Sequence, residues 1–94
     1  NTIAMLAVSN SAAYLVQTPR LPINVNGAGD ATAALFLGYF LQDENLETAL
    51  SKTASAIFAI LEETHRLQER EIQIITSQDR WMKPKTRFQA EQIL

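Results

Sequence analysis

The pattern of apolar and polar positions predicts that the chain begins with two strands. Residues 2–8 are nearly all apolar, with a β-branched residue at each end, which is typical of a strand covered on both faces. A helix is the alternative, but residues 9–11 are turn formers and end the run after a strand's length. Residues 13–17 predict a second short strand. Two strands this close in sequence favour an antiparallel pair.

Two helices are predicted in the middle of the chain. Residues 30–42 have no polar face, so a helix here must be buried on several sides. Gly38 within it lowers helix stability and therefore indicates close packing against a neighbour. Asp43, Glu44 and Asn45 break the apolar pattern and supply N-cap candidates for the next helix. From there to about residue 68, apolar side chains recur at the helical period and charged ones lie mostly opposite. This pattern predicts a surface helix with one buried face.

The last quarter of the chain is predicted to hold one short strand. Apolar and polar residues alternate over 71–76, which favours a strand. Residues 78–84 indicate a polar turn or a short helical piece that Pro84 ends, and residues 88–94 form a tail without a defined element. The order strand, strand, helix, helix, short strand predicts an α/β fold built in layers.

Composition and charge indicate a globular protein and argue against a chain that binds nucleic acid or spans a membrane. A hydrophobic share of 47% and a charged share of 19% are those of a core-forming globular chain. The net charge of -2 supplies no basic field, so neither nucleic acid nor an anionic membrane surface is an expected partner. The apolar run 31–41 is too short to span a bilayer, and the lack of cysteine fits a reducing compartment. The chain enters its first strand without an initiator methionine, which indicates a piece cut from a longer chain.

The candidate chemistry is concentrated in the sequence Asn26-Gly27-Ala28-Gly29-Asp30, directly before the apolar helix. The glycines let an anion approach free backbone N–H groups at a helix N-terminus, and Asp30 supplies a carboxylate that can accept a proton. This combination suits phosphoryl transfer to a hydroxyl group. It is neither a Walker A loop, since no Gly-Lys-Ser/Thr follows, nor the dinucleotide fingerprint, since Thr32 stands in place of the third glycine. A purely structural strand-to-helix turn is the alternative.

Two motifs resemble those of ribokinase-like small-molecule kinases and, among them, of the pyridoxal kinases. The loop Asn-Gly-Ala-Gly-Asp-Ala-Thr-Ala, from position 26, resembles the Gly-x-Gly-Asp loop that opens a buried helix in that superfamily. The ending Glu-Ile-Gln-Ile-Ile-Thr-Ser-Gln-Asp-Arg at 71–80, followed by Lys83-Pro84 and Phe88-Gln89-Ala90, narrows the resemblance to the vitamin B6 branch. It implies that residues 1–94 are the C-terminal part of one ribokinase-like, three-layer α/β/α domain.

The same resemblance implies roles for individual residues. Asp30 would contact the substrate and act as the base that deprotonates its 5′-hydroxymethyl group. The anion hole under the γ-phosphate of ATP would be formed by Gly27, Ala28 and Gly29. The nucleotide side would be lined by Thr18, Pro19, Arg20, Leu21, Val25 and Leu61. The chain departs from the family at Asn26, where a small apolar residue is common, and in the connection 19–24, which looks shorter than in close relatives.

The resemblance further implies ATP with Mg²⁺, a monovalent cation as an aid, a B6 vitamer as substrate, and a cytoplasmic homodimer when the protein is full length. The chain alone is expected to be inactive, because strands that hold the B6 ring lie outside it. Another ribokinase-like kinase, acting on a hydroxymethylpyrimidine or a sugar, is one alternative, and a non-catalytic interaction domain is another. No metal ligand is assigned. His65 is expected to complement a helix dipole and Trp81 to be a packing anchor.

Overall fold

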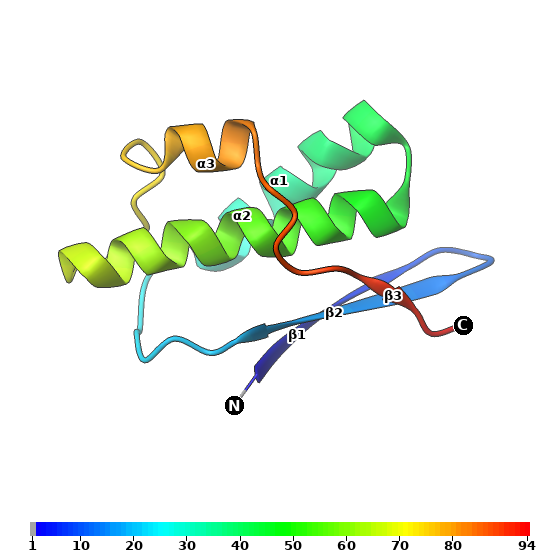
Figure 1. Cartoon of the computed structure of the whole chain (residues 1–94), viewed down its shortest axis with the longest axis horizontal. Coiled ribbons are helices and arrows are strands. Elements are labelled where there is room, and N and C mark those ends of the chain that lie inside the picture. The colour runs from blue at the N-terminus through cyan, green and yellow to red at the C-terminus, as the bar shows by residue number, and fades with distance from the viewer. Residues whose placement is uncertain (1) are drawn as a thin grey trace.

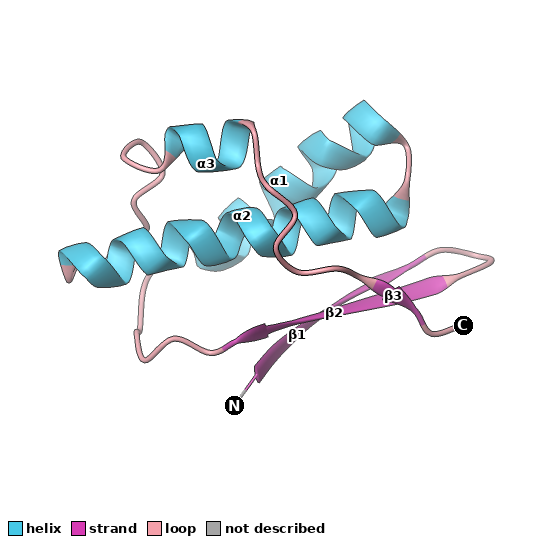
Figure 2. Ribbon diagram, in the orientation of Figure 1, coloured by secondary structure: helices cyan, strands magenta, loops and turns pink. Residues whose placement is uncertain are grey.

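The structure is a computed structural model that describes residues 2–94 (Figures 1 and 2). Its elements in chain order are β1 (Thr2–Val8), β2 (Ala13–Pro19), α1 (Ala28–Asp43), α2 (Leu46–Leu67), α3 (Gln78–Met82) and β3 (Glu91–Gln92). The small sheet forms one layer, and α2 crosses over it. In the view of Figure 1, α1 crosses behind α2, and α3 lies on the side of α2 that faces away from the sheet. The predicted mixed α/β class is confirmed.

The sheet begins with an antiparallel hairpin, as predicted. β1 and β2 pair in register from Thr2 opposite Pro19 to Val8 opposite Ala13, so the second strand extends two residues beyond its predicted end. Ala7 is buried, whereas Leu6 and Val8 are 58% and 65% exposed. The expectation that β1 is covered on both faces is therefore wrong for residues 2–94, because helices from this part of the chain pack on one face of the sheet only.

α2 is the central element of the structure. Of the three predicted N-cap candidates, Asn45 caps it, because its side chain accepts a hydrogen bond of 2.9 Å from the Thr48 N–H. The sheet side of α2 packs against β1 and β2, and the other side packs against Tyr39 of α1. The prediction of one buried face is wrong, because two layers cover the helix. Its buried residues are Ala49, Leu50, Ser51, Thr53, Ala54, Ser55, Ala56, Ile57, Phe58, Ile60 and Thr64.

Two buried serines of α2 hold the C-terminal segment. The Ser51 hydroxyl accepts the Ala90 N–H at 2.8 Å. The Ser55 hydroxyl accepts the N–H groups of Arg87 and Phe88 at 2.9 and 3.0 Å. These bonds satisfy polar groups that would otherwise be buried without a partner. The tail for which no element was predicted therefore crosses α2 and adds β3 to the edge of β2.

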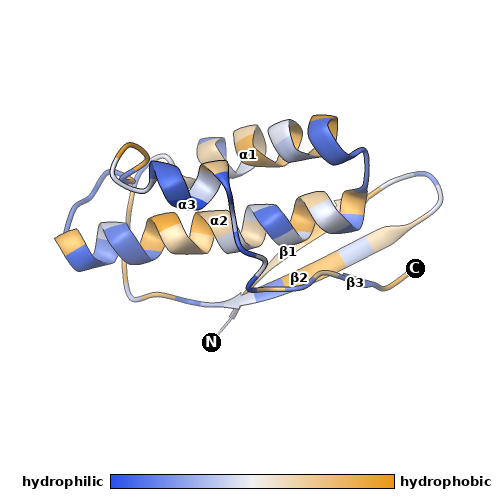
Figure 3. Ribbon diagram, turned by 45° about the horizontal axis from the view of Figure 1, so that its top comes forward, coloured by the Kyte–Doolittle hydropathy of each residue, from blue (hydrophilic) through white to orange (hydrophobic). Residues whose placement is uncertain are grey.

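α1 begins at Ala28, two residues before its predicted start, and it is less buried than its composition predicts. Tyr39 is its one buried residue among those described, while Leu37 and Leu41 are 58% and 69% exposed. Figure 3 shows the apolar positions along this helix. Beyond the backbone of the helix itself, no heavy atom of residues 2–94 lies within 4 Å of the place where a Gly38 Cβ would stand. The close packing expected at Gly38 is thus not provided by this chain.

The predicted strand over residues 71–76 is wrong. Glu71 forms only an isolated parallel bridge with Asn26, and the chain then enters a turn before α3. The Trp81 indole N–H donates to the Ile74 carbonyl at 2.8 Å, and the Gln73 N–H donates to the Thr64 hydroxyl at 3.0 Å. Because these side chains bond the backbone groups of residues 73 and 74, those groups are not available for pairing with a neighbouring strand.

The short helical piece predicted in residues 78–84 is confirmed as α3. Trp81 packs against the cluster around Tyr39, in line with its predicted role as an anchor, and its carbonyl accepts the Tyr39 hydroxyl. His65 lies exposed in the last turn of α2, where a positive charge complements the helix dipole. Of the helices in the described residues, none combines the length and the apolar character needed to cross a membrane.

Candidate active site

The glycine loop forms the start of α1. Gly27 is the N-cap residue and has φ +93°, a left-handed conformation that glycine adopts without steric cost. Its carbonyl accepts the Ala31 N–H at 3.0 Å, which is the first bond of the helix. The amides of Ala28, Gly29 and Asp30 precede that bond, and in the described residues no side chain caps this end of the helix. They therefore provide the free N–H groups that make a helix N-terminus attractive to an anion.

Asp30 lies in the first turn of α1, and its side chain is exposed. The positive end of the helix dipole favours a negative charge at this position. A carboxylate beside unbonded backbone amides can accept a proton from a hydroxyl while the amides stabilise charge on a nearby phosphoryl group. The predicted base and anion hole are thus adjacent in space.

A cavity of about 280 Å³ opens next to this loop, between the end of β2, the connection to α1 and the side of α2. All six residues predicted to line a nucleotide contribute to its wall, together with Ala28 and Gly29 of the loop. Gly27 and Asp30 are not part of that wall. The predicted residues in it are Thr18, Pro19, Arg20, Leu21, Val25 and Leu61.

The cavity wall also contains residues that the sequence did not single out. Ile57 and Phe58 of α2 lie about one turn before Leu61, and Thr32 lies one turn after Ala28, so helical spacing from the predicted residues could have found them. Ile3 and Met5 of β1 also contribute, and no sequence signal linked them to the loop. Within this part of the chain, Arg20 is the one charged residue in the wall, and a guanidinium suits an anionic ligand.

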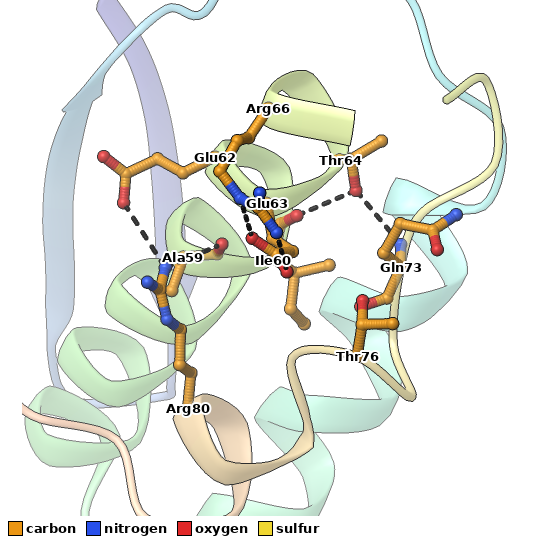
Figure 4. A network of polar contacts seen from close by, with 9 residues as sticks. All are labelled: Ala59, Ile60, Glu62, Glu63, Thr64, Arg66, Gln73, Thr76 and Arg80. Carbon is orange, nitrogen blue, oxygen red and sulfur yellow. Dashed lines mark hydrogen bonds and ion pairs between the residues drawn. The ribbon is translucent and has the colours of Figure 1, made fainter. Parts of the chain in front are cut away.

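The groups with shifted pKa values lie away from the glycine loop. Burial raises the pKa of Tyr39 to about 12. The hydrogen bond from Arg66 lowers the pKa of Glu63. Figure 4 shows this pair on α2, with Nε and Oε1 2.7 Å apart, beside Arg80, which approaches Glu62. These contacts belong to an exposed surface of the helix rather than to the candidate site.

A metal ion was implied by the resemblance together with ATP. No group of three or more His, Cys, Asp or Glu side chains that could hold a metal occurs in residues 2–94. Mg²⁺ at nucleotide sites is usually held by phosphate oxygens, water and one or two carboxylates, so it does not require such a group.

The sequence of the chain is similar to several bacterial kinases, although no family model matches it. It is 52% identical over 91 residues to pyridoxal kinase PdxY of Rubrobacter xylanophilus, which covers 97% of the chain and 31% of that relative. It is 42% identical over 92 residues to pyridoxal kinase PdxY of Leifsonia xyli, covering 98% of the chain and 32% of the relative. The chain thus spans about a third of the length of the curated relatives it matches.

Solved structures share the fold. A putative phosphomethylpyrimidine kinase from Bacteroides thetaiotaomicron has a TM-score of 0.87 at 20% identity, over 98% of the chain and 34% of that structure. The pyridoxal kinase of Entamoeba histolytica with PLP has a TM-score of 0.81 at 23% identity, over 97% and 34%. The pyridoxal kinase of Leishmania donovani in complex with ADP has a TM-score of 0.81 at 18% identity, over 99% and 33%.

These structural likenesses show that the chain shares the α/β fold of those kinases, as predicted, with the last strand at 91–92 instead of 71–76. The similarity in sequence to pyridoxal kinase PdxY of Rubrobacter xylanophilus extends over 97% of the chain. Over 97–98% of its length the chain is thus similar in sequence to pyridoxal kinases, about a third of whose length it spans.

Proposed function

We propose that the full-length protein is an ATP-dependent pyridoxal kinase. It transfers the γ-phosphate of ATP to the 5′-hydroxyl of pyridoxal, and also accepts pyridoxine and pyridoxamine, giving the 5′-phosphates used in vitamin B6 salvage. The observation that carries this proposal is the 52% identity to a pyridoxal kinase over 97% of the chain. The exposed carboxylate and free amides at the start of α1 supply the matching chemistry.

Within that reaction the chain supplies the base and the anion hole. Asp30 accepts the proton of the attacking 5′-hydroxyl, and the amides around Gly27, Ala28 and Gly29 stabilise charge on the transferring phosphoryl group. The cavity beside the loop receives the nucleotide, with Arg20 available to an anionic group. The pyridoxal kinase of Leishmania donovani, which shares this fold, was solved in complex with ADP, and this supports nucleotide binding in the proposed reaction.

The chain alone does not catalyse the reaction in this proposal, because the loop and the cavity wall are only part of a site for two substrates. The full-length enzyme works with Mg²⁺ on the nucleotide, is aided by a monovalent cation, and acts as a cytoplasmic homodimer. Turnover of pyridoxal by residues 1–94 alone would contradict this division of the site.

The role of Asp30 is tested by Asp30→Ala in the full-length protein. General-base catalysis contributes about 10²–10⁴-fold, so kcat should fall at least about a hundredfold while the circular dichroism spectrum stays unchanged. Asp43→Ala is the matched control, since Asp43 ends the same helix and its side chain bonds, within residues 2–94, to Lys52 alone at 2.8 Å. Its turnover should stay near that of the wild type. Unchanged turnover in Asp30→Ala would refute the base role and favour a structural turn.

A second candidate is phosphorylation of a hydroxymethylpyrimidine. It is favoured by the TM-score of 0.87 to a putative phosphomethylpyrimidine kinase, which shows that the fold is shared with such proteins. A panel of pyridoxal, a hydroxymethylpyrimidine and a sugar, offered to the full-length enzyme, separates the candidates. Phosphorylation of the pyrimidine or the sugar without pyridoxal would overturn the vitamin B6 assignment.

A further inference from the structure

The left-handed start of α1 is held locally by the first bonds of the helix, without a side-chain cap from the described residues. Gly27 has φ +93°, and no side chain of the described residues caps the helix there. The preceding connection, residues 20–25, contains one backbone hydrogen bond of its own, from the Ile23 N–H to the Leu21 carbonyl at 2.9 Å. Since phosphoryl transfer needs accurately placed donors, contacts from outside the loop are also needed to hold it.

The segment after α2 provides that contact. The Asn26 N–H donates to the Arg70 carbonyl at 2.8 Å, and the Ile72 N–H donates to the Asn26 carbonyl at 3.3 Å. The Asn26 side-chain amide also donates to Oε1 of Glu71 at 3.3 Å. Three bonds thus join the residue before Gly27 to a segment more than forty positions later in the chain. The amide at position 26, a departure from the family pattern, has a partner here.

Ile72 also packs on the glycine itself. A Cβ built on Gly27 would lie 3.4 Å from Cγ1 and 3.6 Å from Cδ1 of Ile72. The Ile72 side chain is partly buried, whereas Ile75, three residues later in the same segment, is 85% exposed. A Cβ at position 27 would thus be in ordinary van der Waals contact with Ile72, so this side chain lies directly beside the loop and opposes its displacement toward this side.

The supporting segment is in turn tied to the central helix. The Gln73 N–H donates to the Thr64 hydroxyl at 3.0 Å, and that hydroxyl donates to the Ile60 carbonyl at 2.8 Å (Figure 4). Thr64 is fully buried, so water does not compete for these bonds. A continuous path of contacts thus leads from α2 through Gln73 and Ile72 to Gly27.

We propose that residues 70–73 act as a brace that sets the geometry of the anion hole, with Ile72 and Thr64 as positioning residues for phosphoryl transfer. This inference rests on the proposed function. None of residues 70–73 lines the cavity beside the loop, and the contacts described above join the brace to Asn26 and Gly27, so it acts through the loop. Its loss lowers kcat, because the amides move away from the transferring group, and leaves the binding of pyridoxal unchanged.

The test compares Ile72→Ala with Ile75→Ala in the full-length enzyme. Misplacement of reacting groups by about 1 Å can cost up to about a hundredfold in rate, so a partial displacement should lower kcat about tenfold in Ile72→Ala. The KM for pyridoxal should stay within about twofold of the wild type. Ile72→Val keeps Cγ1, the atom nearest to the glycine, and should restore most of kcat. Ile75→Ala should match the wild type.

Hydrogen exchange gives a readout that does not depend on the reaction. The hydrogen-bonded amides of Asn26, Ala31 and Ile72 should exchange faster in Ile72→Ala than in Ile75→Ala, while amides 50–60 of α2 stay protected. Thr64→Val, which keeps the side-chain volume and removes the hydroxyl, should give the same pattern with a smaller loss of kcat, about threefold. Equal kinetics and equal exchange in Ile72→Ala and Ile75→Ala would overturn the brace. A wild-type enzyme without pyridoxal turnover would instead contradict the proposed function, and the exchange comparison would still test the brace.

Discussion

The two long helices differ in burial in the opposite sense to their hydrophobicity: the more apolar helix, α1, is the less buried one. α1 is apolar on every side, yet Tyr39 is its one buried residue within the described chain. α2 carries charged residues and several hydroxyls, yet it is buried through its centre. The contrast shows that position between layers, rather than average hydrophobicity, decides how much of a helix is covered. Ser and Thr hydroxyls make central burial possible, because they bond to backbone groups of their own helix and of the C-terminal segment.

The two helices also have different roles: α2 supports the fold, and α1 carries the candidate site. α2 joins the sheet, α1, α3 and the tail, so it provides the rigid support. α1 presents its N-terminus, with the glycine loop and Asp30, at the surface where a ligand can approach. Sites built on rigid elements hold their donors more accurately than sites on free loops.

The largest expected effect is on the free energy of unfolding, when a buried side chain of α2 and an exposed side chain of α1 are each replaced by alanine. Ile60 is 1% exposed, so Ile60→Ala should lower the free energy of unfolding by about 2–5 kcal/mol. Leu41 is 69% exposed on this chain, so Leu41→Ala should change it by less than about 0.5 kcal/mol. Urea denaturation of the full-length protein measures both. Equal losses would break the contrast and show that another part of the whole protein covers α1.

A smaller effect on stability is expected from alanine substitutions of two glycines of α1, Gly27 at its N-cap and Gly38 within it. Gly27→Ala places a side chain in the left-handed region and against Ile72, and should destabilise the protein by about 1–2 kcal/mol. Gly38→Ala meets no other part of the described chain, and should stabilise by about 0.5–1 kcal/mol through helix propensity. Thermal denaturation of both variants provides the measurement. A destabilised Gly38→Ala would mean that a neighbour approaches this position in the full-length protein.

The smallest effect concerns Tyr39, the one buried residue of α1 in this structure. Tyr39→Phe removes its hydrogen bond to the Trp81 carbonyl and should cost about 1 kcal/mol at pH 7. The folded-state pKa is raised from 10.0 to about 12 by burial, so the protonated hydroxyl adds stability below pH 10 that is lost as the pH rises through 12. The stability of the wild type should therefore fall more steeply than that of the variant between these values. Parallel stability curves from pH 9 to 12 would contradict the assignment.

Local patterns were sufficient for the elements whose signals are short-range. The hairpin and the Asn45 cap depend on neighbouring residues, and both are found where the sequence predicts them. The strand expected at 71–76 depends on a partner, and the alternation in that segment could not reveal that Trp81 and Thr64 would take its backbone groups. The last strand arises instead at 91–92, because Ser51 and Ser55 hold the preceding segment against α2.

In the candidate site, too, some features follow from the local sequence and others depend on tertiary contacts. The sequence by itself determined the glycine loop and the carboxylate in the first turn of a helix, because turn formation and helix polarity act within a few residues. Only the tertiary structure decided that the six predicted nucleotide residues share one cavity, and that Ile72 and Asn26 meet beside Gly27. These contacts join residues far apart in the chain. They depend on how the layers pack, which no local pattern specifies.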